Sequence, residues 1–195
     1  MPDPLLPDGD GHTPLSPDDA TGLLPTYIAT RGELYEAEQR SITSAMIGRS
    51  PTTAQLLDDK YLPDLHSAML GDVWRWAGTY RTRETNLGIE PSLIPGAVRN
   101  LVADVAAWLE YEAYELDEIA VRFHHRLTVI HPFPNGNERH ARICADLLAE
   151  SCDHPAFSWG ARMRASITEL RAAYLGALRA ADAGDMAPLV EFARS

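Results

Sequence analysis

Residues 131–142 read HPFPNGNERHAR and separate two segments with helical periodicity. Prolines at positions 132 and 134 end the preceding helix, and Gly136 frees the backbone to turn. Because a helix begins directly afterwards, its positive N-terminal end and the N–H groups of the turn predict a phosphate site. Arg139 and Arg142 are three residues apart, so we expect both to project from one helical face toward that site. His131 stands at the entrance to the loop, and its side chain suits general-base chemistry near neutral pH.

Apolar residues recur at helical spacing on both sides of this loop. The segments with this pattern run from Val98 to Leu109 and from Ile119 to Ile130 before the loop, and from about Glu138 to Glu150 after it. A last helix is expected to bury Met163, Ile167, Leu170, Tyr174 and Leu178. Earlier in the chain we expect a polar helix from Glu33 to about Met46, and a helical stretch from about Thr53 that is interrupted at Pro63. The fold class predicted is mainly α, without an internal repeat.

The length and composition exclude several classes of protein. A chain of 195 residues can bury a core without metals or disulfides, and no apolar run approaches the roughly 20 residues of a membrane helix. The formal charge of -11 argues against broad binding to nucleic acid or to a membrane surface. The first residues lack the basic and apolar pattern of a secretory signal, so we expect a cytoplasmic protein.

Two segments are not expected to be helical. Residues 1–29 are rich in Pro, Asp and Gly and predict a surface-draped arm, with a single domain over 30–195. Residues 79–89 alternate β-favouring residues with turn formers, which predicts a short, exposed β-hairpin or flap before the core helices.

Taken alone, residues 131–142 also fit an ordinary helix connector whose two arginines form a solvated face. However, they resemble the signature of the Fic (Fic/DOC) family, in which His-Pro-Phe, an acidic residue, Gly-Asn-Gly-Arg and a second Arg recur at these intervals. Residues 65–81 and 117–130 are similar to the family's segments before the flap and before the signature. The likeness runs from about residue 30 to the C-terminus and is greatest to the members labelled mobile mystery protein B.

The resemblance implies a Fic-like helical bundle that transfers AMP from ATP, with magnesium, to a hydroxyl of a target protein. His131 would remove the hydroxyl proton, and Phe133 would anchor the loop in the core. Asn137 would hold the α-phosphate, the N–H groups from Gly136 to Arg139 the diphosphate, and Arg142 the γ-phosphate. The flap would dock the target backbone as an added strand. The flap residues would be Thr79, Tyr80, Arg81, Thr82, Arg83, Asn86, Leu87, Gly88 and Ile89.

Two positions depart from the family pattern. Asn135 stands where the family has the acidic magnesium ligand, and a neutral oxygen holds a hard dication less tightly. Glu138 replaces the second Gly and brings a negative charge to the phosphate cradle. A carboxylate and a phosphate about 5 Å apart repel by roughly 3 kcal/mol at an effective dielectric near 20. Glu138 could therefore weaken ATP binding, stand as an ordinary first-turn acid, or replace Asn135 as the metal ligand.

Many Fic proteins inhibit themselves with a helix whose Glu pairs with the second signature Arg. Glu33 is the candidate here for pairing with Arg142, although an acid in the first turn of its own helix fits equally. The leading function is protein adenylyltransferase. The alternatives are a degenerate Fic domain that binds nucleotide or a partner, and a variant that transfers another phosphate-containing group. The resemblance also leaves open an antitoxin partner or self-association.

Overall fold

The computed structural model describes residues 16–195 and confirms the mainly helical fold. Its helices are α1 (Pro17–Ala20), α2 (Arg31–Met46), α3 (Thr53–Leu56), α4 (Tyr61–Leu70), the short 3-10 helix η1 (Pro91–Leu93), α5 (Ile94–Glu110), α6 (Leu116–Ile130), α7 (Asn137–Ser151), α8 (Ile167–Asp182) and α9 (Ala187–Arg194). The first fifteen residues of the predicted arm lie outside the described residues.

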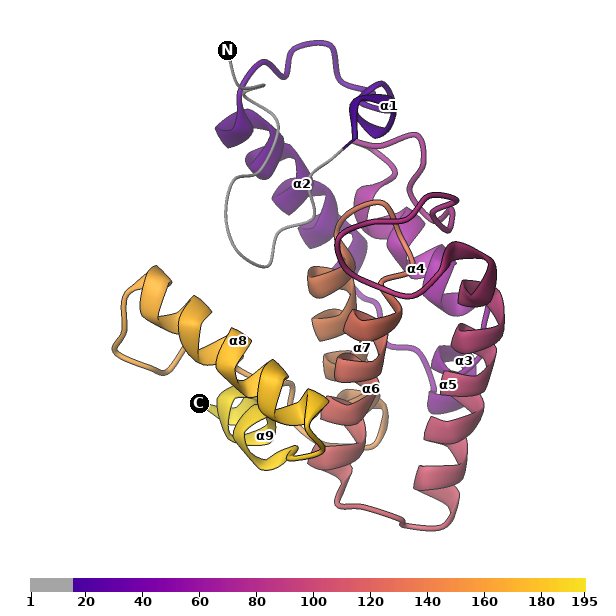
Figure 1. Ribbon diagram of the computed structural model, residues 1–195, viewed down its shortest axis with the longest axis vertical. Coiled ribbons are helices and arrows are strands. Elements are labelled where there is room, and N and C mark those ends of the chain that lie inside the picture. Colours follow the sequence, from indigo (N-terminus) through magenta and orange to yellow (C-terminus); the bar gives the residue numbers. More distant parts are fainter. Residues whose placement is uncertain (1–15) are drawn as a thin grey trace.

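Helices α6 and α7 pack against each other at the centre of the molecule (Figure 1). Helix α5 covers one side of α6, whereas α3 and α4 lie against α7. Helix α2 packs on α4, and α8 packs on α9, which in turn contacts α6. Residues 131–136 join the two central helices at the end that lies near α4.

The apolar spacing of the central helices explains why they pair. Phe123 and Leu127 of α6 and Cys144 and Leu148 of α7 are all buried, one helical turn apart on each helix. Val121 is buried as well, which places α6 against neighbours on more than one side. Among the described residues, no helix combines the length and the apolar character needed to cross a membrane.

The N-terminal half differs from the sequence prediction at two points. Residues 17–20 form one helical turn, because Ser16 caps it and Pro17 occupies its first position, where proline is favoured. Pro63 does not interrupt a helix, since it lies in the first turn of α4, where its missing N–H costs no hydrogen bond. The break falls instead at residues 57–60.

The C-terminal helices were only partly predicted. Met163 precedes α8, and Ile167 begins it with 86% of its surface exposed, so the apolar stripe expected there starts too early. Tyr174 is buried as expected. Helix α9 was not predicted, and it buries Leu189 and Phe192 in the core.

The predicted β-hairpin at residues 79–89 does not form. Residues 16–195 contain no strand, and their one isolated β-bridge joins Leu23 to Trp74. The loop instead hydrogen-bonds to the end of α6 and the residues after it. The Arg81 N–H donates to the Pro132 carbonyl at 2.9 Å, and the Ile89 N–H donates to the Ile130 carbonyl at 3.4 Å.

The side chain of Arg81 explains this arrangement. Arg81 is 5% exposed, and its guanidinium donates to the carbonyls of His131 at 2.7 Å and Arg83 at 2.9 Å. It also donates to the carbonyls of Ile89 and Ile130. One buried cation therefore satisfies carbonyl groups from the loop and from the end of α6, where a positive charge is favoured. Cross-strand pairing is not needed.

We predict that Arg81→Ala destabilises the protein by about 3 kcal/mol, because it leaves several buried carbonyls without a donor. Arg83→Ala is the matched control from the same loop, and it should cost about 1 kcal/mol or less because its ion pairs are exposed. Urea unfolding of both variants measures the difference. Equal free energies of unfolding for the two variants would contradict the role given to Arg81.

Candidate active site

The signature loop, residues 131–136, turns twice through the left-handed region of backbone conformation. His131 ends α6 with φ 52°, and Gly136 precedes α7 with φ 76°. A Cβ atom at Gly136 would lie 2.6 Å from Cδ1 of Leu70, so glycine is needed there for space as well as for conformation. No side chain caps the N-terminus of α7. Its positive end is therefore available to an anion.

Asn137 holds the signature loop closed from inside. Its Oδ1 accepts the Phe133 N–H at 2.8 Å, and its Nδ2 donates to the Phe133 carbonyl at 2.8 Å. The residue is 3% exposed. The Asn137 amide thus fixes the backbone at Phe133 in this conformation, and the expected contact of its side chain with an α-phosphate stays a prediction.

His66 of α4 supports the same loop, and Phe133 packs against it. Nδ1 of His66 accepts the Gly78 N–H at 2.9 Å, so Nε2 is the protonated nitrogen and donates to the Asn135 carbonyl at 3.0 Å. The His66 ring stacks on the fully buried Phe133 ring with 3.7 Å between centroids. Burial lowers the pKa of His66 well below its usual value, which keeps the ring neutral. The sequence prediction assigned His66 no role.

His131 lies at the end of α6 with 8% of its surface exposed. Burial, together with the nearby charge of Arg81, lowers its pKa to about 4, against a smaller opposing effect of a hydrogen bond to the Thr128 backbone. The expectation of a pKa near neutrality is therefore wrong for the free protein. The ring is neutral at pH 7, and the nitrogen that does not bond Thr128 is able to accept a proton.

Arg139 points toward α2 and pairs with Glu38. The distance from Nη2 of Arg139 to Oε2 of Glu38 is 2.8 Å. The other oxygen of this buried carboxylate accepts the Trp74 indole N–H at 2.6 Å. Glu38 was missed by the sequence prediction, although an acid between Leu34 and Ile42 on the apolar stripe of α2 was a signal.

Arg142 points toward α8 and pairs with Glu138 of its own helix. The distance from its Nη2 to Oε1 of Glu138 is 2.6 Å. Its guanidinium also lies 4.4 Å from the centre of the Tyr174 ring of α8 and 5.6 Å from that of Trp159. The two signature arginines thus engage different neighbours, rather than one shared point as their spacing suggested.

In each of these two arginines, one side-chain nitrogen makes no hydrogen bond to the described residues. Nη1 of Arg139 and Nε of Arg142 are buried and have no hydrogen-bond partner among the described residues. A buried guanidinium N–H without an acceptor is costly, so its presence at two neighbouring signature positions favours an anion with several oxygens. The uncapped N-terminus of α7 directly precedes both arginines in sequence and supplies further N–H donors.

The expected magnesium ligands do not form a metal site. Oδ1 of Asn135 accepts the Gly136 N–H at 2.6 Å, and Glu138 is occupied by Arg142. Within residues 16–195, no three His, Cys, Asp or Glu side chains gather closely enough to hold a metal ion. The donor set thus does not fit a magnesium ion held by the protein alone.

Glu33 does not reach the signature in this structure. Its carboxylate accepts the N–H groups of Ala29 and Thr30 at 2.8 and 2.9 Å, and it forms a capping box at the start of α2. These hydrogen bonds lower its pKa. The expected Glu33–Arg142 pair is absent, since the acid on Arg142 is Glu138 and the acid from α2 is Glu38.

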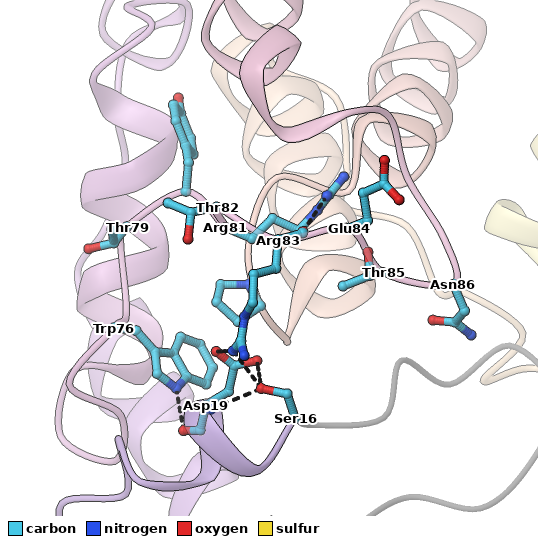
Figure 2. A pocket seen from close by; sticks show the side chains of 12 residues that line it. Ser16, Asp19, Trp76, Thr79, Arg81, Thr82, Arg83, Glu84, Thr85 and Asn86 are labelled. Atoms are coloured by element: carbon cyan, nitrogen blue, oxygen red, sulfur yellow. Dashed lines mark hydrogen bonds and ion pairs between the residues drawn. The ribbon is translucent and has the colours of Figure 1, made fainter.

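The predicted flap residues divide between the interior and the surface. Arg81 is buried, and Gly88 lies against the signature loop, where an added Cβ would be 2.6 Å from Cβ of His131. Arg81 therefore holds the loop in place, whereas Gly88 is exposed and has no room for a side chain on its inner face. An open cavity is lined by the remaining polar residues of the loop, including Thr79, Thr82 and Arg83 (Figure 2).

Comparison with known proteins agrees with this geometry. Residues 56–149 match the model of the Fic/DOC family. The protein adenylyltransferase fic-1 of Caenorhabditis briggsae is 30% identical over 133 residues, which cover 66% of this chain and 25% of that protein. The chain thus spans about a quarter of the length of the curated relatives it matches.

Solved structures share the fold. BepC of Bartonella tribocorum, a VirB-translocated effector solved with bound AMPPNP, has a TM-score of 0.68 at 17% identity, over 92% of this chain and 97% of that one. Fic-1 of Caenorhabditis elegans has a TM-score of 0.61 at 21% identity, over 89% of this chain and 51% of that one. Residues 56–149, which include the signature loop, therefore match the Fic/DOC family model, and the chain shares the fold of these Fic structures.

Proposed function

We propose that this chain is a protein adenylyltransferase that transfers AMP from ATP to a hydroxyl of another protein. The observation that carries the proposal is the pair of buried, unpaired guanidinium nitrogens beside the uncapped N-terminus of α7. A polyphosphate supplies acceptors for all of these donors at once. The similarity to fic-1, named as an adenylyltransferase, supports ATP as the donor.

The reaction follows from the position of His131 next to this site. The neutral ring accepts the proton of the target hydroxyl while the hydroxyl oxygen attacks the α-phosphorus. The new oxygen–phosphorus bond forms as the bond to the oxygen that bridges the α- and β-phosphates breaks, and pyrophosphate leaves. Arg139 and Arg142 hold the negative charge of the phosphates. The loop over residues 79–89 docks the target, with Arg81 holding the loop in place.

Magnesium has no place in these steps, because the described donors do not form a site for it. The family resemblance still predicts that ATP brings a magnesium ion, which its own phosphate oxygens can bind. The greater similarity to the Fic members labelled mobile mystery protein B also stays a prediction. The same holds for an antitoxin partner and for a cytoplasmic location.

A nucleotide- or partner-binding module is the second candidate, because each signature arginine already holds an acid. ATP labelled at the α-phosphate separates the candidates when it is incubated with the chain and a cell extract. An adenylyltransferase labels protein with it, whereas a binding module labels none. Labelling from the γ-phosphate alone would instead indicate transfer of a phosphoryl group.

We predict that His131→Ala lowers the rate of AMP transfer by about 10² to 10⁴-fold, the usual contribution of a general base. ATP affinity should not change. His154→Ala, at a half-exposed ring far along the chain, is the control. Equal transfer by the His131 variant and the wild type would remove His131 from the mechanism. An NMR titration of the free protein should place the His131 midpoint near 4, the value that its burial produces.

We predict that Glu138→Gly raises ATP affinity about tenfold, because the substitution removes a negative charge from the phosphate cradle and frees Arg142. Glu138→Gln keeps the bulk of the side chain and separates charge from size. Calorimetry with ATP and magnesium measures both variants. If Glu138→Gly weakens magnesium-dependent binding instead, Glu138 is a metal ligand that stands in for Asn135.

We predict that Glu38→Gln raises ATP affinity about fivefold, because it releases the charge of Arg139. The amide oxygen can still accept the Trp74 N–H, so the packing of α2 on α4 is retained. Glu36→Gln changes an exposed acid on the same helix and should leave the affinity unaltered. The same calorimetry tests the pair, and an identical response of the two variants would show that Glu38 does not restrain Arg139.

A further inference from the structure

A cavity of about 530 Å³ opens between the turn at α1 and the loop that follows Gly78. Figure 2 shows Arg83 crossing it, with Trp76 and Asp19 on one side and Glu84 and Asn86 further along the loop. Pro134 also lines the cavity. The cavity therefore extends to the signature loop that contains His131.

Arg83 gives this cavity its positive charge. Its neighbour Arg81 is turned inward and donates to backbone carbonyls, so it does not compete for acids in the cavity. Arg83 instead pairs with Asp18 at 2.6 Å and with Asp19 at 2.8 Å, and it donates to the hydroxyl of Ser16. The group bound by Arg83 is thus a hydroxyl followed by two carboxylates.

The turn that makes these contacts is held in place by other bonds. The Trp76 indole donates to the Asp19 carbonyl at 3.0 Å. Behind the turn, the Arg75 N–H donates to the Gly22 carbonyl at 2.8 Å, and the Leu24 N–H donates to the Val73 carbonyl at 2.9 Å. These bonds anchor the segment without Arg83. The contacts of Arg83 are accordingly separable from the docking of the segment.

The ion pairs themselves are weak enough to exchange. The Asp18 side chain is 83% exposed and nearly half of the Arg83 side chain is exposed, so water competes for both groups. A competing segment with the same groups loses little in displacing them. The cavity beyond the turn leaves room for that segment.

We propose that this cavity selects the target through Arg83, which binds carboxylates that follow the hydroxyl-bearing residue of an acidic segment. Ser16, Asp18 and Asp19 are the chain's own mimic of that segment and compete with it. The inference rests on the proposed adenylyltransferase function for the purpose of the site, but its recognition chemistry does not require the transfer step.

A binding experiment tests the proposal without catalysis. The probe is a fluorescent peptide with the sequence of residues 16–24, SPDDATGLL, and the comparison peptide carries asparagine in place of both aspartates. The proteins are the full chain, Asp18→Asn/Asp19→Asn, the same double variant with Arg83→Ala, and the double variant with Arg164→Ala at an exposed arginine before α8.

We expect the double variant to bind the acidic peptide about fivefold more tightly than the wild type, because Arg83 has been released. Arg83→Ala should remove this gain, Arg164→Ala should keep it, and the asparagine peptide should bind no variant more tightly. Equal affinity for the two peptides, or the same affinity with and without Arg83, would overturn the proposal, as would the absence of peptide binding. His131→Ala should bind the peptide as the wild type does, so loss of AMP transfer and loss of acid recognition are observed separately.

Discussion

The last turn of α6 ends at His131, the base of the proposed reaction, and the buried guanidinium of Arg81 holds that end in place. Arg81 donates to the carbonyls of Ile130 and His131, which have no partner within the helix. The same cation binds the loop over residues 79–89, so the position of His131 and the course of that loop depend on one side chain. Burial, together with the charge of Arg81, lowers the pKa of His131 and keeps its ring neutral. In a β-hairpin the loop would pair with itself, and the last carbonyl groups of α6 would lack the hydrogen bonds that they receive from Arg81.

Next to this end of α6, the two arginines of the proposed anion site are each paired with an acidic side chain. Arg139 and Arg142 diverge from the first turns of α7 to Glu38 and Glu138, and each keeps one buried nitrogen without an acceptor. A phosphate chain would bind the unused N–H donors directly. It would interact with the full positive charge of each arginine only after the acid paired with that arginine has moved away. Under the proposed function, two acids from different helices would therefore set the balance between a nucleotide-free and a nucleotide-bound state. This balance, rather than the fold, distinguishes a slow transferase from a binding module.

The sequence predicted the helices because periodic residues such as Phe123, Leu127 and Leu148 are buried at the expected spacing. It also located the loop between α6 and α7, since proline restricts the backbone there and glycine permits the left-handed turn. The sequence prediction failed where contacts between residues far apart in the sequence determine the position of a side chain. Arg81 lies in the segment whose composition predicted an exposed flap, and only its burial against α6 shows that its side chain belongs to the interior. Glu38 and His66 come from other helices, so the spacing within residues 131–142 could not reveal them.

The central claim is that residues 136–142 form a preorganised cradle for a polyphosphate. A titration of ¹⁵N-labelled protein with a non-hydrolysable ATP analogue, followed by NMR, tests it most directly. The account predicts that the amide signals of Asn137, Glu138 and Arg139 and the Nε–H signal of Arg142 shift together, while the Phe133 amide, held by Asn137, changes little. Binding of the analogue without shifts at these residues, or with its main shifts elsewhere on the molecule, would contradict the account.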